Sequence, residues 1–407
     1  MSRSRGFLIK KLNQGSNNAP ETSILHWLLK WSMSQQFDVC IRGGGVVGRT
    51  LALLLARERL KVALVAPPAV PDHEDVRAYA INSASRSLLE SLRAWPEEPF
   101  ATPVLDMQVW GAAGSDAGTM LDFSAQRTAQ SALAWIVDVP TLEQRLGDAV
   151  RFQSHIDVVQ APVKAALQVV CEGQKSSSRN EFGASWSVKP YDQIAIAARL
   201  TSSQPHHGVA RQWFNNGDIL ALLPLSGADG NSLALVWSVS TERADALQKI
   251  PVDDFCAALQ ADCGDTPGHL SLSSQRVSWP LSLSNADRWV GPGWALAGDA
   301  AHTVHPLAGQ GLNLGLADAA ALAGVLAQRE YWRGMGDEKL LRRYERQRKA
   351  DVAVMGAVTD GLHGLFANTD ARLQALRQWG MTGFARSGPL KAWVIRQAMG
   401  RQARPGL

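Results

Sequence analysis

Cysteine and long apolar runs are both scarce in this 407-residue chain. The four cysteines stand far apart, at Cys40, Cys171, Cys256 and Cys263. Their spacing matches no metal-ligand pattern, and in the absence of a secretory signal pattern we expect reduced thiols in a cytoplasmic protein. The longest apolar stretches, such as 50–56 and 319–327, are too short or too interrupted to span a bilayer. We therefore expect neither a transmembrane helix nor a metal site.

Acidic residues are absent from 371–407, where seven basic residues accumulate. These are Arg372, Arg377, Arg386, Lys391, Arg396, Arg401 and Arg404. Leucine and tryptophan side chains are interspersed among them, so this basic tail predicts either a helix lying on an anionic membrane surface or a solvated terminal helix. The net charge of the whole chain, +4, is too small for a nucleic-acid footprint, and we expect no nucleic-acid partner.

Residues 1–32 differ in composition from the rest of the chain. They are polar and rich in Gly, Asn and Ser, with one short apolar patch, "ILHWLLKW", and Met33 follows just before the first convincing strand. We expect a disordered extension, or an upstream start that the cell does not use.

A glycine-rich turn follows the first strand in "FDVCIRGGGVVGRTLALLLARERLKVALVA". An apolar run, a helical run and a second β-branched run form a βαβ unit of the size used for dinucleotides. In G-x-G-x-x-G, Gly43 permits the tight turn, Gly45 admits a pyrophosphate, and Gly48 allows close helix–strand packing. The predicted cofactor turn is Gly43, Gly44, Gly45, Val46, Val47 and Gly48.

The acidic residue that usually binds a ribose at the end of the second strand is missing. Ala66 stands there, and the nearest carboxylates are Asp72, Glu74 and Asp75. One of these, or backbone, would have to contact the ribose.

A second strand-to-helix turn occurs in "GWALAGDAAHTVHPLAGQGLNLG". A strand over 294–297 ends at Gly298-Asp299, which places a carboxylate in a ligand crevice. A helix starting near Gly311 would aim its free N–H groups and positive dipole end at negative charge. Two such turns some 250 residues apart favour a long cofactor, FAD rather than NAD, because the flavin ring gains negative charge on reduction.

The remaining chain predicts an α/β fold: an FAD-binding, Rossmann-like three-layer domain with an inserted antiparallel-sheet substrate domain and a C-terminal helical segment. A helix should start near Asn82, a hairpin should cover 105–123, and 312–366 should be mostly helical. Alternating runs over 184–240, with turns at Asn216-Gly217 and Asp229-Gly230, predict the sheet. The expected division is 33–104, 134–183 and 288–366 for FAD, 105–133 and 184–287 for substrate, and 367–407 for the tail.

Five segments together resemble the ubiquinone-biosynthesis flavin hydroxylases, which have the p-hydroxybenzoate hydroxylase fold. They are "GGGVVG", "DVRAYAINSASRSLLESL", "WIVDVPTLEQRL", "RQWFNNGDILALLPL" and "GDAAHTVHPLAGQGLNLGLADAAAL". The resemblance implies that NAD(P)H reduces FAD and that a flavin C4a-hydroperoxide hydroxylates the ring of a polyprenylated phenol. The middle motif of the family, Asp-Gly, appears here as Glu172-Gly173, followed by Ser178 and Arg179.

The resemblance also implies a set of site residues. Beyond the first turn, the cofactor would meet Arg77, Gly298, Asp299, Pro306, Ala308, Gly309, Gln310, Gly311, Leu312 and Asn313. Of His302 and His305, which both invite an acid–base role, His305 is the catalytic candidate, together with Pro306. Gln212 and Trp213 are candidate substrate residues on a sheet strand beside Arg211, although alternation alone does not say which face is which.

Two alternatives stay open beside the lipid-linked hydroxylase. One is a soluble hydroxylase of a small phenol, and the other is a non-catalytic scaffold in a quinone-biosynthesis complex, motivated by Ala66 and Glu172. Expected partners are the lipidic phenol, other ubiquinone-biosynthesis proteins, and a membrane surface at the inner face of the membrane through the basic tail. The oligomeric state does not follow from the sequence.

Deleting residues 1–32 should leave flavin binding intact, because the segment precedes the first predicted strand. The flavin absorbance per protein chain and the unfolding temperature of the shortened protein would be compared with those of the full chain. Loss of folding on deletion would contradict the prediction.

Overall fold

A six-stranded sheet is built around the first βαβ unit. The computed structural model describes residues 37–66, 75–97, 99–111, 120–215, 217–304 and 309–367. The strand order is β16-β17-β9-β1-β2-β8. The bounds are β1 Phe37–Arg42, β2 Val62–Val65, β8 Ile156–Val159, β9 Ala165–Val170, β16 Val290–Gly291 and β17 Trp294–Leu296. β1 pairs in parallel with β2 and β9 and is mostly buried, which explains its continuous apolar run.

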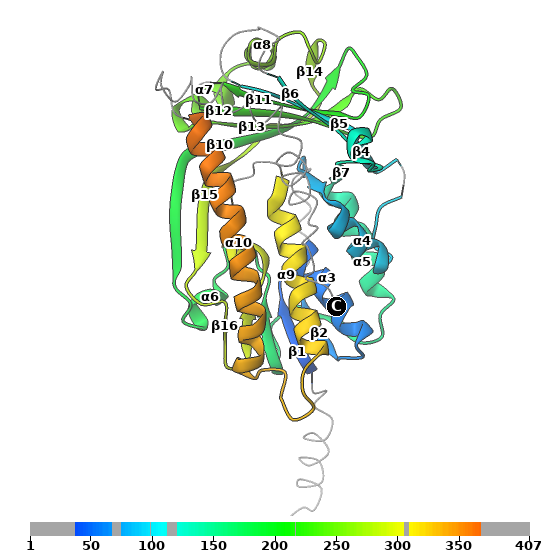
Figure 1. Ribbon diagram of the computed structural model, residues 1–407, viewed down its shortest axis with the longest axis vertical. Helices are drawn as coiled ribbons and strands as arrows, with labels where there is room; N and C mark the ends of the chain where they lie inside the picture. The colour runs from blue at the N-terminus through cyan, green and yellow to red at the C-terminus, as the bar shows by residue number, and fades with distance from the viewer. Residues whose placement is uncertain are drawn as a thin grey trace, which may run out of the picture. The chain divides into compact units, whose positions relative to one another are not determined.

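Helices connect and cover this sheet, and their bounds are α3 Val46–Arg57, α4 Ser83–Ser91, α5 Val139–Arg151, α9 Gln310–Ala327 and α10 Glu338–Ala367. α9 packs against both α3 and α10, and Figure 1 shows it running beside α10. Of the described helices, α9 alone has the length and hydropathy of a membrane span. More than half of it is buried, and it carries the fully buried Asp318, so its apolar surface belongs to the core.

The second large sheet has nine strands. Their order is β18-β15-β10-β13-β12-β11-β5-β6, with β14 paired to β10. The bounds are β5 Asp106–Trp110, β6 Met120–Ser124, β10 Trp186–Ser202, β11 Val209–Asn215, β12 Asp218–Pro224, β13 Ser232–Ser240, β14 Leu270–Leu272, β15 Val277–Ala286 and β18 His302–Thr303. Helices α7 (Thr241–Lys249) and α8 (Val252–Cys263) lie over one face, as Figure 1 shows. On that face Phe255 packs edge-on against Trp237, with ring centroids 5.8 Å apart.

A three-stranded sheet of β3 (Ala78–Ile81), β7 (Ala134–Asp138) and β4 (Ala101–Val104) bridges the two larger sheets. Buried Ile136 of β7 and Ala210 of β11 share one apolar cluster, and Ala80 of β3 packs against it. The large sheet therefore has α8 on one face, and its other face is turned toward the FAD-binding region.

Most local predictions are confirmed. Asn82 caps α4 by accepting from the Ser85 N–H at 2.9 Å, and Pro140 occupies the first turn of α5. The hairpin over 105–123 is the antiparallel pair β5–β6. Helices α7 and α8, which follow the predicted all-β segment, were not expected. The domain limits remain a prediction, although the sheets follow them apart from β18.

All four cysteines are free. Residues 1–32, the basic tail beyond Ala367 and the turn residue Asn216 lie outside the described residues, so the expectations for them stay predictions.

Candidate active site

The first glycine turn is packed so tightly that three of its positions exclude a side chain. A Cβ on Gly43 (φ +115°) would lie 2.4 Å from the Cys171 carbonyl oxygen, and one on Gly48 would lie 1.9 Å from the Gly43 carbonyl oxygen. A Cβ on Gly44 would lie 2.4 Å from that of Ala66. Gly45 is the exception, since its Cβ would meet nothing within 4 Å. The open space of the turn is therefore at Gly45.

The helix that starts at this open space has an N-terminus that no side chain caps. Gly45 is the N-cap of α3, no side chain caps the first N–H groups, and no acidic residue stands in the first turn. Uncapped N–H groups and the positive end of the helix dipole attract anions. The Val46 side chain is buried in the core, so it offers only its backbone here.

The second turn lies directly against the first. Its strand β17 leads into the short 3-10 helix η2 (Gly298–Ala300), with Gly298 at φ +63°. A Cβ on Gly298 would lie 3.2 Å from a Val47 methyl, and one on Gly315 would lie 2.8 Å from the same methyl. Val47 of α3 therefore sits between η2 and α9, and segments about 250 residues apart in sequence pack directly against each other.

The start of α9 repeats the pattern of α3. Gly309 (φ +62°) is the N-cap, with no side-chain cap and no acidic residue in the first turn. A Cβ on Gly311 would meet nothing within 4 Å, so space adjoins the N–H groups of Gln310, Gly311 and Leu312. Asn313 acts differently from the prediction. Its amide donates to the Ala80 carbonyl at 2.8 Å and its oxygen accepts from the Asn82 N–H at 3.0 Å, so it fixes the helix start and leaves no free end.

Asp299 is the middle residue of η2, which packs between α3 and α9. The residue is accessible to solvent, and the protein groups around it raise the pKa of its carboxyl by partial desolvation. No hydrogen bond or ion pair of this side chain is found within the described part of the chain. His302 and, to a smaller extent, Arg77 oppose the rise in the pKa of Asp299, and Asp318 adds to it. Asp299 in turn raises the pKa of Tyr79 beyond the effect of burial, so Tyr79, which had not been predicted, lies near this carboxylate.

The Glu172-Gly173 segment links both turns. Glu172 accepts from the hydroxyls of Ser176 at 2.7 Å and Ser178 at 2.8 Å. Buried Arg179 donates to the carbonyl of Ala300 in η2 at 3.2 Å, with its guanidinium 3.8 Å from the Trp186 ring centroid. Because Gly43 touches the Cys171 carbonyl, the segment also supports the first turn. The change from Asp to Glu is accommodated locally by the two serines.

Of the two candidate substrate residues, only Gln212 is on the inward face. It alternates with Ala210, whose cluster includes residues of β3 and β7. Trp213 stacks on Trp110 at 4.7 Å and packs in the core beneath α8. The expectation that both line one pocket is wrong for Trp213, because adjacent strand residues point to opposite faces.

The structure describes only some of the predicted histidines and of the carboxylates considered for the ribose. His302 is buried, and its Nε2 lies 2.7 Å from Asp318 Oδ2, so its ring is engaged inside the protein. Asp75 is already engaged by Arg77, which donates to it from the backbone and the guanidinium at 2.6–3.0 Å. His305, Pro306 and Ala308 lie outside the described residues, as do Asp72 and Glu74.

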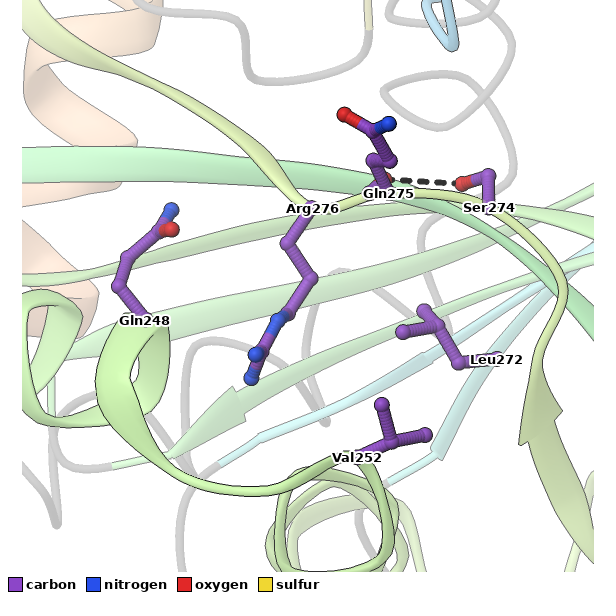
Figure 2. A pocket seen from close by; sticks show the side chains of 6 residues that line it. All are labelled: Gln248, Val252, Leu272, Ser274, Gln275 and Arg276. Carbon is purple, nitrogen blue, oxygen red and sulfur yellow. Dashed lines mark hydrogen bonds between the residues drawn. The ribbon is translucent and has the colours of Figure 1, made fainter.

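A pocket of about 400 Å³ in the large sheet's helical layer contains none of these residues. Figure 2 shows Arg276 reaching between α7 and α8, where it donates to the carbonyls of Leu247 at 2.7 Å and Ile250 at 3.0 Å. Both carbonyls belong to the C-terminal end of α7, and the guanidinium lies 5.0 Å from the ring centroid of Phe255 in α8, so it is committed to these contacts and we assign the pocket no part in the chemistry.

Comparisons with known proteins agree with this geometry. Residues 111–358 match the family model described as an FAD binding domain. The chain is 34% identical over 391 residues to ubiquinone hydroxylase UbiL of Rhodospirillum rubrum, covering 89% of each protein. It is 30% identical over 396 residues to the 3-demethoxyubiquinol 3-hydroxylase of Escherichia coli, covering 90% of this chain and 99% of the relative.

Solved structures give the same fold at lower identity. PqsL of Pseudomonas aeruginosa, in complex with 2-aminobenzoylacetate, superposes with a TM-score of 0.72 at 19% identity, covering 86% of this chain and 100% of that one. The p-nitrophenol 4-monooxygenase PnpA of Pseudomonas putida gives 0.71 at 15% identity, covering 90% and 99%.

Fold and site together define an FAD-dependent monooxygenase of the p-hydroxybenzoate hydroxylase fold. FAD is its cofactor, and NAD(P)H is the reductant typical of this class. Within the class, the chain belongs to the ubiquinone-biosynthesis flavin hydroxylase family.

Two alanine substitutions in the first turn should separate folding from cofactor binding. Gly45→Ala places its methyl in open space, so the apoprotein should unfold near the wild-type temperature while FAD binds about tenfold or more weakly. Gly48→Ala drives its methyl into the Gly43 carbonyl and should destabilise the apoprotein itself by about 1–3 kcal/mol. Thermal unfolding and flavin fluorescence titration measure the two effects. Equal loss of apoprotein stability in both variants would contradict the distinction.

Proposed function

We propose that this enzyme hydroxylates the aromatic ring of a polyprenylated phenol or quinone precursor in ubiquinone biosynthesis, using FAD, NAD(P)H and O₂. The observation that carries the proposal is the packing of α3, η2 and α9 around Val47, which brings together the Asp299 carboxylate and two helices whose N-termini have neither a side-chain cap nor an acidic residue. The names of the relatives, ubiquinone hydroxylase and 3-demethoxyubiquinol 3-hydroxylase, supply the substrate class.

The described residues fit FAD in three places. The space at Gly45, in front of the α3 N–H groups, suits the pyrophosphate. Asp299 suits the hydroxyl groups of the ribityl chain, because it is a carboxylate acceptor without a described partner. The start of α9, with its space at Gly311, suits the electron-rich edge of the ring system. Bound FAD supplies the redox chemistry that turns O₂ into an oxygenating agent.

The protein's own contribution is to position the substrate and to exclude water. Ala80 links the substrate sheet to the flavin-binding helix. It packs with the inward face of the large sheet, and it lies next to Gly309 at the start of α9. A phenol held against the Gln212 face of the sheet would therefore lie near the flavin-binding helix start. Gln212 is buried and has both a donor and an acceptor for a ring hydroxyl.

The lipid-linked substrate also motivates a place for the enzyme in the cell. We infer that it works as a peripheral protein at the inner face of the membrane, where a polyprenylated phenol is dissolved. The seven basic residues and the leucines and tryptophans of the basic tail support this, because such segments bind anionic lipid surfaces. Other proteins of the same biosynthetic route are the expected partners.

The proposal is tested with the purified holoprotein. We expect a yellow protein that oxidises NAD(P)H and converts a short-chain prenylphenol into a product one oxygen atom heavier, measured by mass spectrometry. A small soluble phenol such as 4-hydroxybenzoate serves as the comparison substrate. Turnover of only the small phenol would favour the soluble-hydroxylase alternative, and colourless protein that takes up no FAD would favour the scaffold. The quinone intermediate that accumulates in a deletion strain identifies the ring position.

Asp299→Ala should weaken FAD binding by about tenfold to a hundredfold, because it removes a charged acceptor worth about 1.5–3 kcal/mol. Flavin fluorescence titration of the apoprotein measures the dissociation constant. Asp245→Ala, which removes an exposed carboxylate on α7, is the matched control and should bind FAD as wild type does. Full affinity in Asp299→Ala would refute the assigned role.

A further inference from the structure

Asp318 is a fully buried carboxylate with three hydrogen-bond donors around it. Oδ2 accepts from the Gly298 N–H at 2.9 Å and lies 2.7 Å from His302 Nε2, while Oδ1 accepts from Arg348 Nε at 2.7 Å. Asp318 is 0% exposed, His302 2% and Arg348 4%. None of the three is among the groups assigned to FAD above.

The three side chains join separate elements of the flavin site. Asp318 lies on α9, His302 follows η2 in β18, and Arg348 lies on α10. The contact is close because Gly315 stands one turn before Asp318. A Cβ at Gly315 would lie 3.3 Å from the Gly298 Cα, so α9 can approach η2 only with glycine there. Asp318 is thus the polar link at the tightest contact between α9 and η2.

Asp318 is held as an anion by its partners. Burial alone would raise the pKa of this carboxyl, but the charges and hydrogen bonds of His302 and Arg348 outweigh burial and lower it. Arg348 is itself fixed by Asp351 at 2.6 Å and by the Leu314 carbonyl at 3.3 Å. The His302 ring stacks on Trp289, with centroids 4.8 Å apart. Each partner of Asp318 therefore has only one arrangement available to it.

Gly298, whose N–H donates to Asp318, directly precedes Asp299. Gly298 adopts the left-handed conformation, φ +63°, so the direction in which Asp299 leaves the strand depends on how this one peptide is held. Arg179 holds the other end of η2 through the Ala300 carbonyl. A short turn fixed at both ends presents its middle residue in one orientation.

We propose that Asp318, kept in place by His302 and Arg348, is a positioning residue for FAD: it orients the Asp299 carboxylate toward the cofactor and ties the turn that carries this carboxylate to the body of α9. The proposal rests on the assignment of Asp299 to FAD made above. It adds that the two ends of the flavin site are set relative to each other by one buried side chain, which never touches the cofactor.

A double-mutant cycle on FAD affinity tests this. Asp318→Asn should raise the FAD dissociation constant by about tenfold or more in the wild-type background. In the Asp299→Ala background the same change should matter less than about twofold, since the carboxylate it orients is gone. Apoprotein titrated by flavin fluorescence provides the constants, and thermal unfolding of each apoprotein reports folding.

Two further variants keep the test decisive. His302→Gln retains a donor toward Asp318 and is used if Asp318→Asn does not fold; its smaller loss of affinity should also vanish in the Asp299→Ala background. Tyr344→Phe is the matched control. It removes a buried hydrogen bond at 2.8 Å to the Leu296 carbonyl, close to the turn but not on it, and should leave FAD affinity unchanged.

The outcomes separate this proposal from the one on which it rests. Wild-type affinity in Asp318→Asn and His302→Gln, with Asp299→Ala weakened, overturns the positioning role alone. Equal fold losses in both backgrounds also overturn it, because they indicate a general structural effect. Wild-type affinity in Asp299→Ala overturns the earlier assignment of Asp299, whatever Asp318→Asn does.

Discussion

The packing of Val47 between Gly298 and Gly315 is the contact on which the flavin site depends. A valine methyl fills the place that side chains at both glycines would need, at 3.2 and 2.8 Å from their would-be Cβ atoms. Close packing at this point brings the start of α3, the η2 turn and the body of α9 together, so the core fixes the positions of two helix N-termini and one carboxylate relative to one another. A cofactor long enough to reach both helix starts is therefore bound by backbone groups whose separation the core determines.

Two aspartates, nineteen residues apart in sequence, have different electrostatic roles in the site. Burial raises the pKa of the Asp299 carboxyl, which has no described hydrogen-bond partner, whereas His302 and Arg348 lower that of Asp318 despite its full burial. The unpartnered carboxylate is available to a ligand, and the paired one is committed to the protein. Asp299 is accessible to solvent, so ligand hydroxyl groups can reach its carboxylate and donate hydrogen bonds to it.

Sequence reasoning succeeded where the decisive interactions are local. The strand, glycine turn and helix at Gly43 to Gly48 follow from backbone sterics within a few residues, as does the Asn82 cap. It failed where partners are distant. The Arg348–Asp318 pair spans 30 positions and the Arg179–Ala300 bond spans 121, and neither leaves a periodic signal. Gln212 and Trp213 could be assigned to opposite faces of β11, but only the packing beneath α8 shows which face is inward.

The two departures from the family pattern have unequal consequences. At Glu172 the longer side chain is absorbed by the hydroxyls of Ser176 and Ser178, and Arg179 still reaches the Ala300 carbonyl. At Ala66 the side chain is a methyl group that packs beside Gly44, and the nearby Asp75 is occupied by Arg77. No carboxylate of the described residues thus replaces the ribose-binding acid at the end of β2. Asp72 and Glu74 lie outside the described residues, so among the groups that the structure describes, the pyrophosphate turn, Asp299 and the start of α9 are the ones that fit FAD.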